Sequence, residues 1–559
     1  MPNDPRGPFQ SIQPVLQPAL QPIWQIFLDY LDCASRPASD ASARALLDRT
    51  ADTLRALDDE TLLQAVNTAR ETGRLDEVIR IASAAARLAP ERAGPSFATG
   101  LALQFADRHA EAVDIYRRAL AIDPAFPNLR NNLAAALIHV NGKSEEIARL
   151  LEDCIADNPG DRLAWINLGR LRPDDTGVAR AIDANRRALA IAPDDPLALN
   201  NYALAQKEAQ NWDEAERAAR AACHYAPDDP VSHFNLSLID LARGRYVEGW
   251  PGHERRWQGA AEMKRGRPVF TKPQWQGEPI AGRTLLLWGE QGMGDLLQFC
   301  RYVPLLAERV HREGGRLLWN SFPQMGALLE RSLGGHCDGY SAGGGIESLP
   351  PHDCEVSLMS LPFHFGTCED TIPAPLRYLA SDPAAAARWR KRLADERRLK
   401  VGLAWTGSTG HQRNPYRHIG LARLAAHLAG LTHDVAFYSL QPGAADDVAA
   451  AHAAGFDIAD FSAEWQTFDD TAAFVDALDL VISVCTSSAH LAGALGQRTW
   501  VLLDVNPHWI WQLERRDSPW YAHTTLYRQK AFRQWEPVLD EVAADLWALA
   551  RARPARALT

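Results

Sequence analysis

One aspartate stands among glycines at the end of an apolar run, where a chain often turns close to a ligand. The run TLLLWG at 284–289 leads into GMGDLLQF, so Asp295 lies between Gly294 and the first apolar position of a helical pattern. A carboxylate there would repel a phosphate, but it can take a proton from a hydroxyl as a general base. A helix start would keep it ionised by lowering its pKa. Glu290, near the end of the same apolar run, is the rival base, and a simple helix cap is the other interpretation of Asp295.

A second segment with chemical potential is TSSAHLAGALG, which starts a helix directly after the apolar run that ends near Val484. The first N–H groups of a helix lack partners within it, so those of Thr486, Ser487 and Ser488 can bind a phosphate without special side chains. His490 lies in the first turn, where it can contact a phosphate or a ribose, although a lone histidine is often only packed.

The polar loop after GLAWTG supplies positive charge and hydroxyl groups. Arg417 and Arg413 can neutralise the negative charge of a departing phosphate. Thr406 and Ser408 can donate hydroxyl hydrogen bonds to the same group. Loop arginines are also commonly just solvated, so both interpretations stand for Arg413 and Arg417.

The composition limits the kinds of protein that this chain can be. It has 559 residues and a net charge of -11, which argues against a general nucleic-acid binder. Its eight cysteines form no CxxC pair, which fits a reduced, cytoplasmic setting. The start of the chain does not resemble a secretory signal, and no run of about 18 apolar residues predicts a membrane span. No metal cluster stands out, so we expect neither a metal nor another cofactor.

The first half of the chain is a repeat. Short helical patterns close on prolines at 90, 124, 159, 193 and 227, and a small residue lies five positions before each proline. A period of about 34 residues marks the tetratricopeptide repeat, in which each unit is a pair of antiparallel helices. This pattern predicts an α-solenoid.

Asparagines recur in register with the prolines. They are Asn132, Asn167, Asn201 and Asn235, each eight residues after a closing proline. They fall on the first helix of each repeat, which lines the concave groove of such a solenoid. An amide both donates and accepts hydrogen bonds, so a column of amides can clamp an extended peptide backbone. The alternative is that they only bond neighbouring turns.

Short apolar runs alternate with helical segments in the second half. Strands are expected at 284–289, 315–321, 399–407, 433–441, 478–485 and 498–504. Helices are expected between them, for example along the apolar-periodic segment 296–310. Alternation of this kind predicts parallel sheets that are covered by helices on both faces.

Three motifs in this half resemble those of heptosyltransferase-type enzymes. They are GMGDLLQFCRYVPLL, GLAWTGSTGHQRNPYRHIGL and LDLVISVCTSSAHLAGALGQRTWVLL, which together span about residues 285 to 505. The resemblance implies a GT-B fold with two Rossmann-like lobes. It also implies Asp295 as the base of the acceptor lobe, Arg417 rather than Arg413 at the donor phosphates, and no metal. Relatives usually have aspartate where this chain has Cys485.

The resemblance and the breaks in the pattern imply a domain order. We expect an N-terminal helical segment, a repeat domain, an acceptor lobe, a nucleotide-sugar lobe and a C-terminal helix at 1–60, 61–260, 261–385, 386–535 and 536–559.

Repeats joined to such a catalytic half resemble bacterial flagellin glycosyltransferases, and the asparagine column resembles the superhelix of O-linked N-acetylglucosamine transferase. These resemblances imply an inverting glycosyltransferase that moves a sugar from a nucleotide-sugar to Ser or Thr of a protein held by the repeats, with flagellin as one candidate. Two alternatives stay open: a glycosyltransferase that acts on a lipid or polysaccharide glycan, and a non-catalytic repeat scaffold with a degenerate transferase half.

Overall fold

We describe the protein from a computed structural model, in which residue 48 and residues 51–171, 177–263, 266–290 and 292–552 are described. Most of the expected N-terminal segment therefore lies outside the described residues. The chain divides into two compact units, Met1–Tyr202 and Ala203–Thr559. Each unit is described by itself below.

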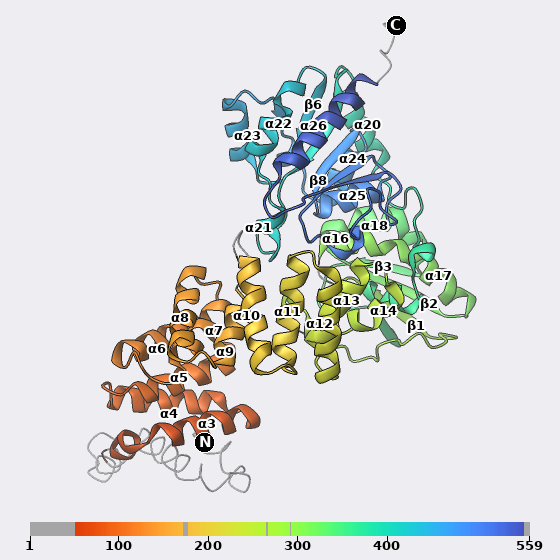
Figure 1. Cartoon of the computed structure of the whole chain (residues 1–559). Helices are drawn as coiled ribbons and strands as arrows, with labels where there is room; N and C mark the ends of the chain where they lie inside the picture. Colours follow the sequence, from red (N-terminus) through yellow and green to blue (C-terminus); the bar gives the residue numbers. More distant parts are fainter. Residues whose placement is uncertain (1–47, 49–50, 172–176, 264–265, 291, 553–559) are drawn as a thin grey trace, which may run out of the picture. The chain divides into compact units, whose positions relative to one another are not determined.

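Antiparallel helix pairs follow the proline period (Figure 1). The pairs are α3 (Asp59–Thr72) with α4 (Leu75–Leu88), α5 (Ala93–Phe105) with α6 (His109–Ile122), α7 (Leu129–His139) with α8 (Ser144–Asp157), α9 (Arg162–Leu168) with α10 (Gly177–Ile191), α11 (Pro196–Glu208) with α12 (Trp212–Tyr225), and α13 (Pro230–Ala242) with α14 (Tyr246–His253). The small residues before the prolines allow the helices to pack closely, since Ala85, Ala119, Ala188 and Ala222 are fully buried. The predicted tetratricopeptide-like solenoid is confirmed.

The second unit contains a four-stranded parallel sheet, which we call the first lobe together with its helices. Its strands are β1 (Thr284–Trp288), β2 (Arg316–Ser321), β3 (Gly339–Ala342) and β4 (Cys354–Ser357), in the order β3-β2-β1-β4. β1 is central, with Leu286 aligned with Leu318 on one side and Glu355 on the other. The crossover helices include α16 (Met293–Phe299), α17 (Val303–Arg312) and α18 (Gly326–Leu333).

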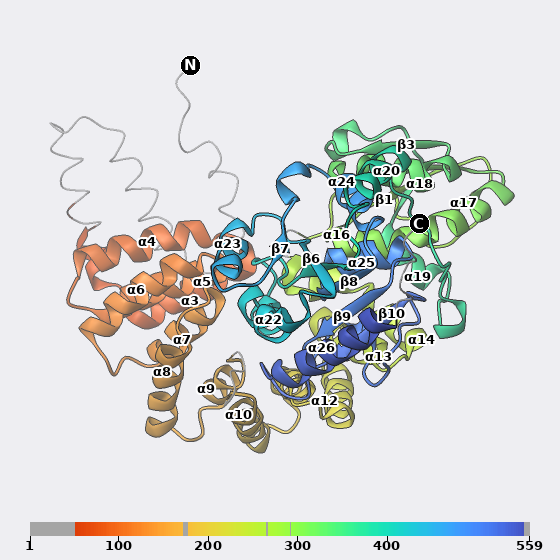
Figure 2. The same cartoon turned by 90° about the horizontal axis from the view of Figure 1, so that it is seen from above.

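A six-stranded parallel sheet forms the second lobe. Its strands are β5 (Leu399–Ala404), β6 (Val435–Ser439), β7 (Ile458–Ala459), β8 (Leu480–Val484), β9 (Thr499–Leu503) and β10 (Thr524–Arg528), in the order β10-β9-β8-β5-β6-β7. Its helices are α20 (Pro383–Arg392), α21 (Asn414–Arg417), α22 (Leu421–Leu428), α23 (Ala445–Ala453), α24 (Phe468–Val475), α25 (Ser487–Ala494) and α26 (Glu536–Arg551). Helices cover both faces of the sheet, as strands that are buried on both sides require (Figure 2).

All six predicted strands are present, and the predicted α/β region with two lobes is confirmed. The sequence did not predict β3, β4, β7 and β10, which are short or polar. The helical pattern at 296–310 is not one helix. It divides into α16, a 3₁₀ turn at Cys300–Tyr302 and α17, and Pro304 lies in the first turn of α17.

The last helix pair is part of the core of the two lobes. Tyr246 and Trp250 of α14 are buried in one cluster with Phe299 of the first lobe and Trp509 and Trp520 of the second. The rings of Trp250 and Trp509 meet edge to face at 5.4 Å. The indole N–H of Trp250 donates to the Thr367 carbonyl at 2.7 Å. These repeats are therefore structural members of the α/β unit.

Among the described residues, no helix has both the length and the apolar character that crossing a bilayer requires.

Candidate active site

In both sheets the strand order reverses at the strand that comes first in the chain, because later strands are added on its other side. In the first lobe, β2 and β3 extend the sheet to one side of β1, and β4 then returns to the other side. In the second lobe, β6 and β7 extend to one side of β5, and β8 then returns to the other side. Ligands of open α/β sheets bind beyond the carboxyl ends of strands at such points. The segments that follow β1, β5 and β8 carry the residues that the sequence predicted for the site.

In the turn after β1, the carboxylate of Asp295 folds back onto the backbone at Gly292. Gly292 precedes α16 with φ 88°, a conformation that L side chains rarely adopt. A Cβ placed on Gly292 would lie 2.1 Å from Oδ2 of Asp295. Only glycine therefore fits at 292, and its presence lets the Asp295 side chain fold back over the start of α16.

The protein around Asp295 raises the pKa of its carboxyl group. Burial raises the pKa of its carboxyl to about 7; the negative charge of Glu290 adds to this effect and Arg256 opposes it. The expectation that the helix start would lower this pKa is therefore wrong. α16 has only seven residues, and the loss of hydration outweighs the field of its N-terminus. A carboxyl with this pKa suits proton transfer near neutral pH.

Glu290 has a different environment, a buried ion pair. Arg256 donates from Nε to Oε2 at 2.8 Å and from Nη2 to Oε1 at 2.5 Å. The side chains of Arg256 and Glu290 are 2% and 0% exposed. Ser357, at the end of β4, also donates to Glu290. With both oxygens occupied, Glu290 is held in place and is less suited to accept a proton than Asp295.

Arg256 is a residue of this region for which the sequence did not predict a role. It lies on α15 (Arg256–Gly259), in a Trp-rich stretch between repeats and lobes, and also bonds Glu254 at 2.8 Å and Ser360 at 2.9 Å. Removing one partner of a buried ion pair typically costs about 3–5 kcal/mol. The only signal in the sequence is an arginine beside aromatic residues, because its partner is 34 positions away.

The N-terminus of α25 faces the same region from the second lobe. α16 packs against α25, and the two helices lie together in both views (Figures 1 and 2). Thr486 precedes α25 and makes no side-chain cap, and Ser487 and Ser488 form its first turn. All three are partly exposed. The binding of an anion by their N–H groups stays a prediction.

His490 is more enclosed than its neighbours. Nδ1 lies 2.8 Å from the Tyr521 hydroxyl, and the ring stacks on Trp511 with centroids 5.5 Å apart. Burial lowers its pKa to about 3, and the charge of Arg417 contributes to this shift. His490 is therefore neutral at physiological pH and forms part of the wall between α16 and α25.

Arg417 lies close to the start of α25. Its Nη1 donates to the carbonyl of Cys485 at 2.7 Å, and a Cβ on Gly407 would lie 2.3 Å from its Nη2. Its Nε contacts Oδ1 of Asn414 at 3.3 Å. No carboxylate pairs with Arg417 in the described part of the chain. The guanidinium therefore lies next to the backbone that leads into α25.

Thr406 and Ser408 occupy the loop that leads to Arg417. Asn414 Nδ2 donates to Thr406 Oγ1 at 3.2 Å, and the Gly407 amide donates to Asn414 Oδ1 at 2.9 Å. These bonds fix the loop on the end of β5. Ser408 is exposed.

Arg413, in contrast to Arg417, is already paired. Its Nη1 donates to Glu208 Oε1 at 2.6 Å and its Nη2 to Asp504 Oδ1 at 3.1 Å. Two carboxylates therefore neutralise this guanidinium within the protein.

Cys485 replaces the aspartate of the resembling enzymes and leaves the local backbone ordered. Its thiol accepts a hydrogen bond from the Trp511 indole N–H at 3.2 Å. Burial raises the pKa of the thiol, and the nearby Asp295 contributes a small part of the shift.

The sequence matches no protein-family model. It is similar to Protein FlbA of Caulobacter vibrioides, with 28% identity over an alignment of 450 positions that covers 74% of this chain and 72% of FlbA.

Solved structures resemble parts of the chain. The glycosyl transferase family 9 protein of Veillonella parvula covers 49% of this chain and 98% of its own, with 9% identity and a TM-score of 0.37. YrrB, a TPR protein with a peptide-binding site, covers 35% of this chain and 97% of its own, with 16% identity and a TM-score of 0.27. Such low scores carry no argument about activity.

The asparagines of the repeats differ in what they bond. Asn132 donates to the backbone carbonyl four residues before it at 2.9 Å. Asn167 donates to Asn131 Oδ1 of the preceding pair at 2.8 Å, a bond between repeats. Nδ2 of Asn201 is buried without a partner in the described residues. Asn235 lies on α13 and is partly exposed.

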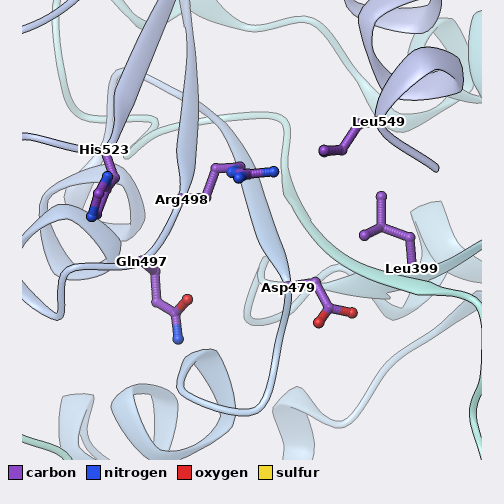
Figure 3. A pocket seen from close by; sticks show the side chains of 6 residues that line it. All are labelled: Leu399, Asp479, Gln497, Arg498, His523 and Leu549. Carbon is purple, nitrogen blue, oxygen red and sulfur yellow. The ribbon is translucent and has the colours of Figure 1, made fainter. Parts of the chain in front are cut away.

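A separate hollow of about 330 Å³ lies at the opposite, amino-terminal edge of the six-stranded sheet (Figure 3). Leu399, Asp479 and Arg498 lie at the starts of β5, β8 and β9, and His523 precedes β10. None of the predicted site residues lines it. It is therefore distinct from the region between α16 and α25.

Proposed function

We propose that the protein is an inverting glycosyltransferase that moves a sugar from a nucleotide-sugar to a serine or threonine of a protein acceptor. One observation carries the proposal. A carboxyl with a pKa of about 7 at the start of α16 lies beside the start of α25 and the uncompensated charge of Arg417. In this proposal a base and an anion site adjoin each other beyond the carboxyl ends of two parallel sheets, where open α/β sheets bind ligands.

The reaction assigns a role to each group. Asp295 takes the proton of the acceptor hydroxyl as its oxygen attacks the anomeric carbon. The bond between that carbon and the phosphate oxygen breaks on the opposite side, so the configuration inverts. Arg417 and the free N–H groups of Ser487 and Ser488 stabilise the negative charge of the departing diphosphate. Thr486, Thr406 and Ser408 complete the donor side.

The structure's contacts support a choice among the candidates. Asp295 is preferred to Glu290 as the base because Arg256 holds both oxygens of Glu290. Arg417 is preferred to Arg413 as the phosphate ligand because Arg413 is neutralised by Glu208 and Asp504. We assign the acceptor side to residues 261–385 and the nucleotide-sugar side to residues 386–535.

The repeats supply the acceptor in this proposal. Asn132, Asn167, Asn201 and Asn235 lie on the first helices of their pairs, as a backbone clamp requires. The resemblance stated for the sequence makes flagellin one acceptor to test.

Mass spectrometry of the captured partner tests the proposal. The full chain carrying Asp295→Asn is used to capture acceptor proteins from the native host. The captured protein is then incubated with the unsubstituted chain and a panel of nucleotide-sugars. We expect a mass increase of one or more sugar residues on Ser or Thr. Sugar transfer to a lipid or polysaccharide fraction instead would favour the second class of enzyme. No consumption of any nucleotide-sugar would favour the scaffold.

A further inference from the structure

The last residue of α11 contacts two loops of the second lobe. Oε1 of Glu208 accepts hydrogen bonds from Arg413 Nη1 at 2.6 Å and from Asn506 Nδ2 at 2.8 Å. Glu208 lies in a repeat helix, 205 residues before Arg413 and 298 before Asn506. One carboxylate of the repeats therefore joins the loop after β5 to the loop after β9.

Asp504 closes this cluster from the other side. It contacts Arg413 at 3.1 and 3.4 Å and accepts the Asn506 amide at 2.8 Å. Its side chain is 4% exposed, compared with 16% for Glu208. Hydrogen bonds between ionised groups are stronger than those between neutral groups. Arg413 is therefore fixed between one carboxylate of the lobe and one of the repeats.

Fixing Arg413 also fixes Arg417. Arg413 precedes α21, and its carbonyl accepts the amide of Arg417 at 3.2 Å. The four residues of α21 form a single turn, with Pro415 near its start. A short turn has little stability of its own, so its position depends on what holds its ends. Glu208 and Asp504 hold one end, and the bond from Arg417 to the Cys485 carbonyl holds the other.

The Glu208 carboxylate also contacts the loop that carries Trp511. Asn506 leads to Trp511, which stacks on His490 and donates to Cys485. Oε2 of Glu208 is buried and has no partner among the residues that the structure describes. Glu208 therefore contacts both loops through the same oxygen atom, Oε1.

We propose that Glu208 is a positioning residue for the donor: it orients the loop of Arg417 for the diphosphate of a nucleotide-sugar. This inference rests on the proposed function and deepens it. The donor site is thereby completed by the repeat region, which supplies no atom that touches the donor.

Nucleotide affinity is the first test. UDP, GDP, ADP and CDP are titrated separately into the full-length chain by calorimetry, and the one that binds is used with Glu208→Gln. The glutamine keeps the size of the side chain and loses the charge that holds Arg413. If the binding-competent loop falls to about one-tenth of the population, affinity falls about tenfold. In turnover, the KM for the donor should rise while kcat at saturating donor is retained.

Glu214→Gln is the matched control. Glu214 lies on α12 and pairs with Arg217, so this change removes an ion pair of a nearby repeat helix that holds neither Arg413 nor Asn506. Its nucleotide affinity should equal that of the parent. Equal affinity of Glu208→Gln and the parent would overturn the proposal.

Hydrogen exchange in the absence of nucleotide separates this inference from the proposed function. Glu208→Gln should speed exchange at the amides of residues 413–418 and leave those of α22 unchanged. Faster exchange with no nucleotide bound by the parent would refute the donor assignment but establish the contact. Unchanged exchange would overturn the positioning role even if a nucleotide binds.

Discussion

Gly294 of the first lobe lies against the imidazole of His490 of the second. A Cβ placed on Gly294 would be 3.0 Å from Cδ2 of His490, closer than most real contacts of that kind. The two residues are in the first turns of α16 and α25. The close approach of α16 and α25 at this point therefore depends on the lack of a side chain at position 294.

Gly294→Ala should slow sugar transfer while the protein stays folded. The added methyl group separates α16 from α25 by a few tenths of an ångström, and a misplacement approaching 1 Å can cost about 100-fold in rate. Turnover and the melting temperature are measured together. Gly335→Ala is the control, because nothing lies within 4 Å of a Cβ at that position. Equal turnover of the two variants would show that the contact with His490 does not set the geometry.

Asp295→Ala should abolish transfer and leave donor binding intact. Loss of a general base typically costs about 100- to 10,000-fold in rate. Single-turnover transfer and nucleotide affinity are the measurements. Near-normal turnover would remove Asp295 from the mechanism and return Glu290 to consideration.

The rate should depend on pH through the same carboxyl. A base acts in its deprotonated form, so kcat/KM should rise with pH, with a midpoint near the pKa of about 7, and level off above it. A flat profile between pH 5 and 8 would exclude this assignment.

The stability of the fold should decrease as the pH rises, whereas the rate should increase. The folded pKa of Asp295 lies above its usual value of 3.8, so the folded state binds the proton more tightly than the unfolded state. Ionisation of Asp295 therefore lowers the free energy of unfolding as the pH rises from about 4 to about 7. Asp295→Asn cannot ionise, so its gain in melting temperature over the parent should be larger at pH 8 than at pH 4.

Arg417→Ala should weaken nucleotide-sugar binding or slow departure of the leaving group. A charge-assisted hydrogen bond contributes about 1.5–3 kcal/mol, which corresponds to roughly 10- to 150-fold. Arg417→Lys should recover part of the loss because it keeps the charge but not the fork geometry. Arg423→Ala is the control, since that arginine forms an exposed pair with Glu536. Unchanged affinity and rate in Arg417→Ala would place this residue at the solvated surface.

Replacing the four asparagines of the column by alanine should separate acceptor capture from chemistry. The variant changes Asn132, Asn167, Asn201 and Asn235 together, because each neutral hydrogen bond contributes only about 0.5–1.5 kcal/mol. We expect it to fold, since alanine is the better helix former, and to keep any slow hydrolysis of donor that the parent shows. It should no longer modify the intact protein acceptor, as measured by mass shift. Full modification by a variant with unchanged circular dichroism would mean that the acceptor binds elsewhere.

Local patterns in the sequence predicted most of the fold. The proline period identified the helix pairs, and apolar runs identified the strands that are buried on both faces. β4 was missed because its sequence, CEVS, is short and carries Glu355, whose burial depends on Arg267, 88 positions away. Periodicity contains no information about such a partner.

The sequence indicated those candidate site residues whose pattern lies within one short segment. The glycines around Asp295 and the helix start at Ser487 are of this kind. The pairing of Arg256 with Glu290 and of Arg413 with Glu208 depends on residues that only the fold brings together. The pKa of Asp295 was predicted with the wrong direction for the same reason, because burial is a property of all the elements that pack around it.

The burial of Tyr246 and Trp250 among the aromatic residues of both lobes determines where the chain can be exchanged with that of a relative. A chimera joined after α14 would leave an unfilled hydrophobic cavity beneath Trp509 and would not fold well. A chimera joined at the boundary between Tyr202 and Ala203 keeps α12, α13 and α14 with their own lobes. If the proposed function holds, replacing the earlier helix pairs would transfer the acceptor preference of the relative, while both lobes keep the last repeats that complete their core.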